Sequence, residues 1–68
     1  MALDIADVCK RAGLPASTLR FYEAKGLIAP VGRHGLRRLY DEAVLERLAL
    51  IALGRLAGFT LDEIGEMF

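Results

Sequence analysis

The chain has 68 residues, 54% of them hydrophobic, and its nine basic side chains balance nine acidic ones. This length allows one domain at most and leaves no spare volume for an enzyme cleft, while the high apolar content excludes a disordered chain. The single cysteine, Cys9, excludes an intrachain disulfide, and the first residues lack the apolar stretch of a signal peptide. We therefore expect a protein of a reducing cytoplasm.

Two short helices joined by a tight turn are predicted over about residues 5–25. In the first, apolar side chains recur at helical spacing, at Ile5, Val8, Cys9 and Ala12. Asp4 can cap the start of this helix, and Gly13 supplies the left-handed residue that ends it. Pro15 suits the first position of the second helix, which stops at Gly26. This pattern is typical of a helix-turn-helix, whose second helix enters the major groove of DNA.

A short β-wing is predicted over about residues 27–40. Helical periodicity is absent there, and helix-breaking residues stand at Pro30, Gly32 and Gly35. We expect one strand around residues 27–28 and another around residues 36–40, joined through the glycines. The tip of the wing would then carry Arg33 and His34.

Two further helices are predicted, over about residues 42–57 and 61–68. Asp41 opens the earlier one, and its expected buried stripe consists of Val44, Leu45, Leu48, Ile51, Ala52 and Leu56. Thr60 and Glu63 have the spacing of a capping box at the start of the later one. Because helical spacing continues to the last residue, we expect the chain to be the N-terminal head of a longer protein.

The predicted fold class is mainly α, a winged helix-turn-helix built from two helices, a short β-wing and two more helices in one domain of residues 1–68. The neutral total charge conceals a basic middle segment. Residues 10–38 carry seven basic side chains against one acidic side chain, Glu23, which gives a net charge of +6. The flanking segments are acidic, so a polyanion would contact this middle segment.

Four residues of the second helix are candidates for DNA contact. Ser17, Thr18 and Arg20 stand in its first turns, the part that reaches base edges in the major groove. Arg20 is the strongest candidate, because its guanidinium group can bind guanine O6 and N7 or a phosphate; the alternative is a solvated surface arginine. Tyr22 can place its hydroxyl on a phosphate.

The wing holds the densest basic segment, formed by Arg33, Arg37 and Arg38 with Tyr40 beside them. Arginines on a loop next to an aromatic residue suit backbone phosphates. The alternative interpretation is a solubilising loop.

Nothing in the sequence indicates catalysis or a bound cofactor. Metal-ligand spacing, a nucleophile elbow, a glycine-rich phosphate cradle and a carboxylate pair are all missing from the 68 residues. The longest strongly apolar run, residues 48–53, is far too short to span a membrane. We therefore expect no enzyme activity, no catalytic residue, no cofactor, no metal site and no membrane contact.

Three segments of the chain carry a family resemblance: IADVCKRAGLPASTLRFYEAKGLI, RRLYDEAVLERL and LAGFTLDEI. They resemble the DNA-binding head of the MerR family of bacterial transcription regulators, and TLRFYEAKGLI followed by RLYD is the most specific part. The resemblance implies a homodimer on palindromic promoter DNA in the bacterial cytoplasm, at the nucleoid. It also implies that the dimer distorts the promoter spacer, so that RNA polymerase can engage both promoter elements.

The resemblance also places the family's DNA contacts. The recognition-helix contacts fall on Arg20 and Tyr22, and the wing contacts fall on Arg33, Arg38 and Tyr40. Pro15 stands where a capping serine or threonine is usual, and the wing reads GLRRLY where an aromatic residue commonly precedes the arginine. Arg37 or Arg38 is therefore expected to share the family role.

A second function class stays open alongside DNA binding. Leu50 and Leu53 lie away from the main apolar stripe of their predicted helix and widen its apolar surface. Such a surface fits a winged-helix module that binds another protein without binding DNA.

Overall fold

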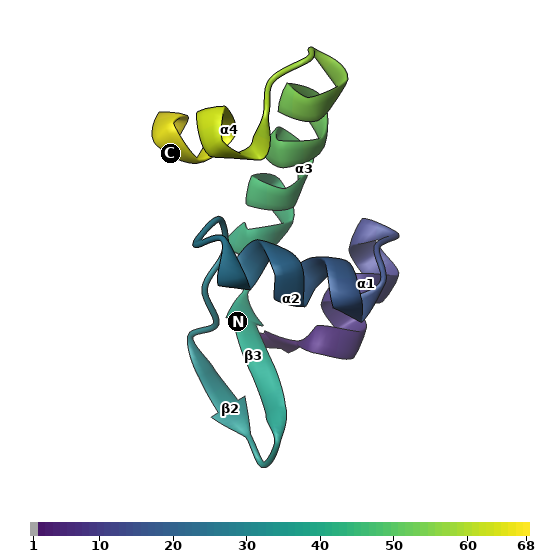
Figure 1. Ribbon diagram of the computed structural model, residues 1–68. Coiled ribbons are helices and arrows are strands. Elements are labelled where there is room, and N and C mark those ends of the chain that lie inside the picture. The colour runs from purple at the N-terminus through teal and green to yellow at the C-terminus, as the bar shows by residue number, and fades with distance from the viewer. Residues whose placement is uncertain (1) are drawn as a thin grey trace.

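The computed structural model describes residues 2–68, which form a small antiparallel sheet and four helices (Figure 1). The strands are β1 (Ala2–Asp4), β2 (Gly32–His34) and β3 (Arg37–Asp41). The helices are α1 (Ile5–Ala12), α2 (Ala16–Ala24), α3 (Ala43–Leu56) and α4 (Leu61–Met67). The predicted winged helix-turn-helix is confirmed: α1 and α2 form the helix-turn-helix, and β2 and β3 form the wing.

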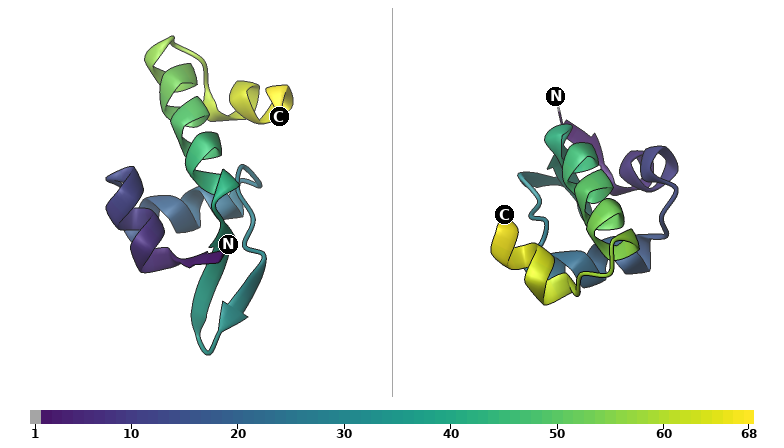
Figure 2. Two further views of the ribbon diagram at one scale, coloured as in Figure 1. Left: turned by 180° about the vertical axis from the view of Figure 1, so that it is seen from behind. Right: turned by 90° about the horizontal axis from the view of Figure 1, so that it is seen from above.

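The molecule is elongated, 37 Å along its longest axis and 21 Å and 19 Å across the others. The wing hairpin and the α3–α4 pair extend from opposite ends of the body that α1, α2 and the first turns of α3 form (Figures 1 and 2). None of the helices in residues 2–68 has the length and apolarity required to span a bilayer.

The turn signals of the helix-turn-helix act as expected. The backbone N–H of Asp7 donates to Oδ1 of Asp4 at 3.0 Å, which caps α1, and Gly13 ends this helix with a left-handed φ of 70°. Pro15 differs slightly from its prediction. Its ψ of 156° is extended, so it precedes the first helical residue instead of occupying that position.

The sheet differs from the predicted hairpin in two ways. Its strand order is β1-β3-β2, so β3 lies in the centre and pairs with a strand from the chain start that the sequence did not predict. The strand expected at residues 27–28 is wrong. Leu27 and Ile28 are buried, at 2% and 3% exposure, but they lie between α2 and the wing and fill the core without joining the ladder.

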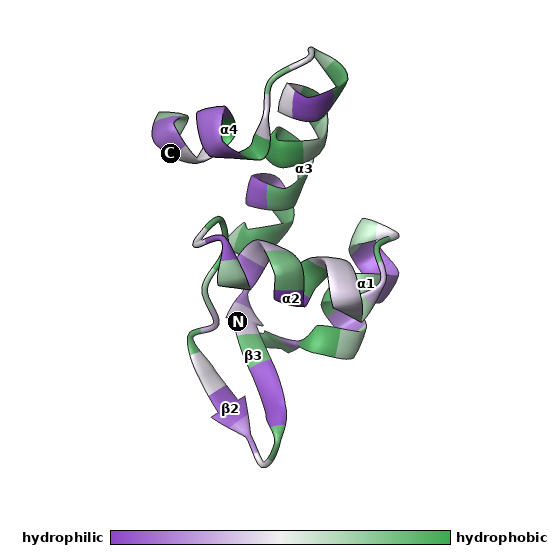
Figure 3. Ribbon diagram, in the orientation of Figure 1, coloured by the Kyte–Doolittle hydropathy of each residue, from purple (hydrophilic) through white to green (hydrophobic). Residues whose placement is uncertain are grey.

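The wing tip also lies elsewhere than expected. Arg33 and His34 belong to strand β2, and the turn that follows them contains Gly35, which adopts a left-handed φ of 63°. Leu36 was expected in the second strand, but it lies in this turn and is 94% exposed. The strands of the wing are mainly hydrophilic (Figure 3).

Helices α3 and α4 form a closely packed pair. A Cβ atom at Gly54 would lie only 2.8 Å from Cδ1 of Ile64, so the two helices meet where α3 has no side chain. The predicted capping box is confirmed, with Glu63 N donating to Thr60 Oγ1 at 3.1 Å and Thr60 N donating to Glu63 Oε1 at 2.9 Å. The buried stripe of α3 is shorter than expected, because Ala52 is exposed and Leu56, on the last turn beyond the core, is 86% exposed.

The hydrophobic core connects all four helices with strands β1 and β3, whereas the three residues of β2 are exposed. Its fully buried large side chains come from α1, α2, β3, α3 and α4, and they are Val8, Leu19, Tyr40, Ile51 and Ile64. Each long element therefore contributes at least one anchor. The exposed faces of α2 and the wing are held in place by this shared core.

Candidate nucleic-acid interface

Helix α2 is anchored by Leu19, which is fully buried, and it presents its opposite side to solvent. Ser17 and Arg20, three residues apart, are both exposed on this side, while Thr18 is half-buried. Tyr22 is half-buried and packs against the core. The structure therefore leaves Ser17 and Arg20 free to reach a ligand in front of α2.

The pairing register places the arginines of the wing on two faces. Arg33 pairs with Arg38, and His34 pairs with Arg37, across the antiparallel ladder of β2 and β3. Because directly paired residues share a face and neighbours alternate, Arg33 and Arg38 lie on one face and Arg37 on the other. Tyr40, two residues after Arg38, shares the Arg38 face.

Arg38 and Tyr40 both bind Glu23 of α2. The Nε atom of Arg38 lies 3.0 Å from Oε1 and 3.1 Å from Oε2 of Glu23, and the Tyr40 hydroxyl donates to Oε1 at 3.0 Å. This shows that the Arg38 face of the wing is the one turned toward α2. The side chains of Arg38 and Glu23 keep 26% and 24% of their surface exposed.

Tyr40 is a core residue, contrary to the prediction that it contacts phosphate. Its exposed fraction is 0%, and burial, followed by the hydrogen bond and charge of Glu23, raises its pKa to about 12. The sequence suggested a surface role because Tyr40 follows two arginines in a basic segment. The alternation of β3 instead turns its ring inward, opposite Leu3 of β1.

Arg37 makes a different contact. Its Nη1 atom lies 3.0 Å from Oδ2 of Asp4, the residue that also caps α1. The pKa of Asp4 is lowered first by the Asp7 backbone hydrogen bond and also by Arg37. Arg37 remains 63% exposed. The sequence does not distinguish whether Arg37 or Arg38 fills the family's wing position. In the structure, Arg38 is the one that lies beside α2 and Arg33.

Two residues have structural roles that the sequence patterns do not predict, Glu23 and Arg47. Glu23 had one available signal, because it is the only acidic residue in the basic segment 10–38. Arg47 had none: its Nε donates to the carbonyl of Leu27 at 2.7 Å, and its guanidinium carbon lies 4.2 Å from the centre of the Phe68 ring. Both contacts of Arg47 depend on how α3 packs against the segment after α2 and against the end of the chain.

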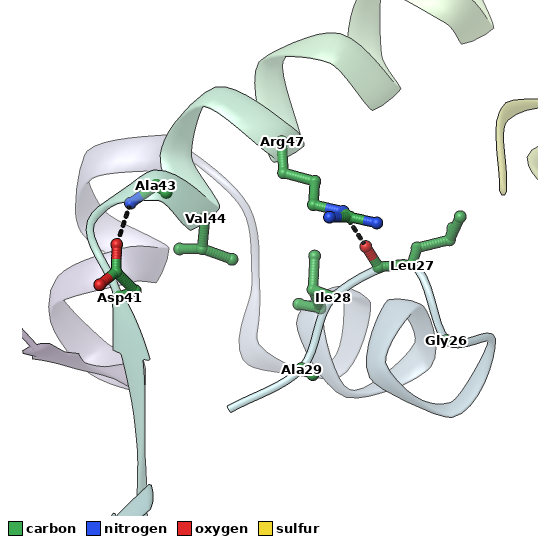
Figure 4. A pocket seen from close by; sticks show the side chains of 8 residues that line it. All are labelled: Gly26, Leu27, Ile28, Ala29, Asp41, Ala43, Val44 and Arg47. Atoms are coloured by element: carbon green, nitrogen blue, oxygen red, sulfur yellow. Dashed lines mark hydrogen bonds between the residues drawn. The ribbon is translucent and has the colours of Figure 1, made fainter. Parts of the chain in front are cut away.

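Arg47 borders a pocket of about 280 Å³ between the segment after α2 and the start of α3 (Figure 4). Both charged residues of its lining are bonded within the fold. Arg47 holds the Leu27 carbonyl, and Oδ1 of Asp41 accepts from the N–H of Ala43 at 2.9 Å. We therefore interpret the pocket as a gap in the packing beside Arg47 and not as a ligand site. Residues 2–68 contain no cluster of three metal-ligating side chains.

Comparison with known proteins identifies similar chains. The family model described as MerR HTH family regulatory protein matches residues 3–68. The chain is 41% identical over 63 residues to an HTH-type transcriptional activator SoxR homolog of Chromobacterium violaceum, a match that covers 93% of this chain and 43% of the relative. It is also 41% identical over 66 residues to the HTH-type transcriptional regulator CueR of Salmonella typhi, covering 96% and 48%.

A solved structure has the same fold. It is the crystal structure of HiNmlR, a MerR family regulator lacking the sensor domain, bound to promoter DNA, and it matches with a TM-score of 0.83 at 31% identity. The match covers 98% of this chain and 54% of that chain. This chain thus spans about half the length of the relatives it matches.

Proposed function

The chain belongs to the MerR HTH family of regulatory proteins, and from this premise we propose that it binds double-stranded promoter DNA sequence-specifically and regulates transcription. Helix α2 enters the major groove, and the wing lies on the flanking phosphates. The observation that carries the proposal is the placement of Arg20 and Arg33 as exposed cations on the recognition helix and on the α2-facing side of the wing.

In this proposal the candidate residues contact different parts of the DNA, according to the element on which they lie. Ser17, Thr18 and Arg20 reach base edges from the first turns of α2. Tyr22 places its hydroxyl on a phosphate at the border of the groove. Arg33 and Arg38 bind backbone phosphates from the α2-facing side of the wing, and Arg37 binds one from the opposite face, where it is exposed beside Asp4. Tyr40 supports the wing from the core, because its buried hydroxyl is bonded to Glu23.

In this proposal the full protein acts as a homodimer on a palindromic site in the cytoplasm of a bacterium, at the nucleoid. Bound DNA is distorted, and RNA polymerase responds to the distorted promoter without direct contact with this chain. The exposed leucines of α3, Leu50, Leu53 and Leu56, support a dimer because they leave an apolar face for further contacts.

The alternative, a winged-helix module that binds only proteins, is not favoured. The two relatives are named as a transcriptional activator homolog and a transcriptional regulator, and the HiNmlR structure holds promoter DNA. These names also describe regulators and not enzymes, in agreement with the expectation that the chain has no enzyme activity. The apolar face of α3 serves assembly in addition to DNA binding.

A salt titration of duplex binding tests the proposal. Two copies of the chain, joined by a flexible linker, are titrated into a fluorescent duplex selected from a randomised pool. If Z phosphates are contacted, log K falls with log salt with a slope of about −0.9Z, and unrelated duplexes bind more weakly than the selected one. Absent binding, or binding that does not change with salt, would overturn the proposal.

A further inference from the structure

An acidic residue in the middle of a DNA-binding surface requires an explanation. Glu23 lies in the last turn of α2, and it is the one acid among the seven basic residues of segment 10–38. A free carboxylate at this place would repel the phosphates that the surrounding arginines attract. The structure shows that this carboxylate is not free.

Both oxygens of Glu23 are turned toward β3. Oε1 accepts from the Tyr40 hydroxyl at 3.0 Å and lies 3.0 Å from Nε of Arg38, while Oε2 lies 3.1 Å from the same nitrogen. About three quarters of the side chain is removed from solvent, with 24% exposed. In residues 2–68, these are the side-chain hydrogen bonds that join α2 to β3.

The wing depends on this connection for a second reason. Arg33 and Arg38 are directly paired across β2 and β3, and two like charges in that position repel each other. Glu23 neutralises Arg38 through Nε. Within residues 2–68 the bonds of Arg38 to Glu23 are made through Nε, and 26% of the Arg38 side chain is exposed. Glu23 thereby orients the arginine without occupying the whole guanidinium group.

We propose that Glu23 is the positioning residue of the DNA-binding surface: it holds Arg38 and Tyr40 so that the wing keeps one distance and one angle from α2. The inference rests on the proposed function. Its consequence is that base contacts by α2 and phosphate contacts by the wing form together, because one rigid unit carries both. Glu23 itself does not touch DNA.

For Glu23→Gln, the inference predicts weaker DNA binding, whereas the loss of a negative charge by itself predicts stronger DNA binding. Removal of a negative charge from a DNA-facing surface strengthens binding when the charge acts only through its field. If Glu23 positions the wing, Glu23→Gln weakens binding by roughly ten-fold, a typical coupling for residues in one bonded network. The matched control is Glu66→Gln, the same charge change on the exposed surface of α4.

The binding experiment is a double-mutant cycle on the selected duplex, at low and high salt. We expect Glu23→Gln to weaken binding in the wild-type background but to change it by less than about two-fold in the Arg38→Ala background. Glu66→Gln should bind at least as tightly as the wild type. Binding by Glu23→Gln that equals or exceeds that of Glu66→Gln would overturn the inference, as would full additivity with Arg38→Ala.

A second measurement needs no DNA. The Nε–H proton of Arg38 is followed by NMR hydrogen exchange in the free chain. We expect strong protection in the wild type and in Glu66→Gln, and weaker protection in Glu23→Gln, whose single neutral side-chain oxygen would be shared with Tyr40. Equal protection in all three overturns the inference even if DNA binds. Absent duplex binding by the wild type instead overturns the proposed function, while the exchange result still reports on the contact between α2 and the wing.

Folding is controlled within the same set of variants. Glu23→Gln retains a side-chain oxygen that can accept from Tyr40, so we expect a cooperative unfolding transition. A second variant pair compares Glu23→Gln with its parent in a Tyr40→Phe background, where the buried hydroxyl is absent. Weaker binding caused by Glu23→Gln in both backgrounds supports positioning through Arg38, and unchanged binding in the Tyr40→Phe background overturns it.

Discussion

The hydroxyl of Tyr40 donates a hydrogen bond of 3.0 Å to Oε1 of Glu23, across 17 positions of sequence. It joins the centre of the sheet to the last turn of α2. Because Tyr40 is fully buried, water cannot replace Glu23 as its partner. The Tyr40 hydroxyl and the Glu23 carboxylate therefore connect the basic wing to α2.

Tyr40→Phe tests the contribution of this hydrogen bond to stability. We expect the free energy of unfolding to fall by about 1 kcal/mol, the typical net value of one buried hydrogen bond, because the ring still fills its place in the core. Urea unfolding followed by circular dichroism measures the change. Tyr22→Phe is the control, since Tyr22 is only half-buried, and a loss there as large as that of Tyr40→Phe would contradict the assignment.

The raised pKa of Tyr40 predicts a loss of stability at alkaline pH. Its pKa is about 12 in the folded chain against a usual value of 10.0, so the folded chain holds the phenolic proton more tightly than the unfolded chain. This stabilisation is complete below pH 10 and is lost as the pH rises through 12. Over that range the wild type should lose roughly 2–3 kcal/mol more than Tyr40→Phe. Parallel pH profiles of the two proteins in urea unfolding would contradict the prediction.

Gly54→Ala tests the close approach of α3 and α4. The added Cβ would lie 2.8 Å from Cδ1 and 2.9 Å from Cγ1 of Ile64, which is buried. We expect a net loss of about 1 kcal/mol, because overpacking by about 1–3 kcal/mol exceeds the roughly 1 kcal/mol that alanine contributes as a helix former. Thermal unfolding checks it. Gly32→Ala, which has open space around its Cβ, should change stability by less than about 0.5 kcal/mol. Stabilisation by Gly54→Ala would show that helix propensity outweighs the contact.

Arg20→Ala and Arg33→Ala should separate base reading from phosphate binding. On the selected duplex, Arg20→Ala is expected to weaken binding by about 1–3 kcal/mol and to relax specificity at the base pairs it contacts. Arg33→Ala is expected to weaken binding to all duplexes alike and to reduce the magnitude of the salt slope by roughly 0.9. Fluorescence anisotropy on selected and scrambled duplexes measures both. A uniform loss for Arg20→Ala would make it a phosphate contact instead.

The features that the sequence determined by itself are those set by neighbouring residues. Asp4 caps α1 through the N–H three residues later, and Thr60 and Glu63 bond each other across the same interval. Gly13 turns the chain because its backbone tolerates a positive φ without help from the rest of the fold. These short-range interactions set where the helices begin and end, and so place Arg20 on α2.

Tertiary packing sets which polar side chains stay exposed and which support the fold. Tyr40 was assigned to the surface from its basic neighbours, but pairing with Leu3 of β1 and the bond to Glu23 place it in the core. Leu27 was assigned to a strand, but it is buried and its carbonyl accepts from Arg47. Such partners are distant in sequence and meet only after the chain has packed. The periodicity of a short segment cannot predict a contact with a distant segment. The contact that joins α2 to the wing is therefore a property of the fold, although every residue in it is visible in the sequence.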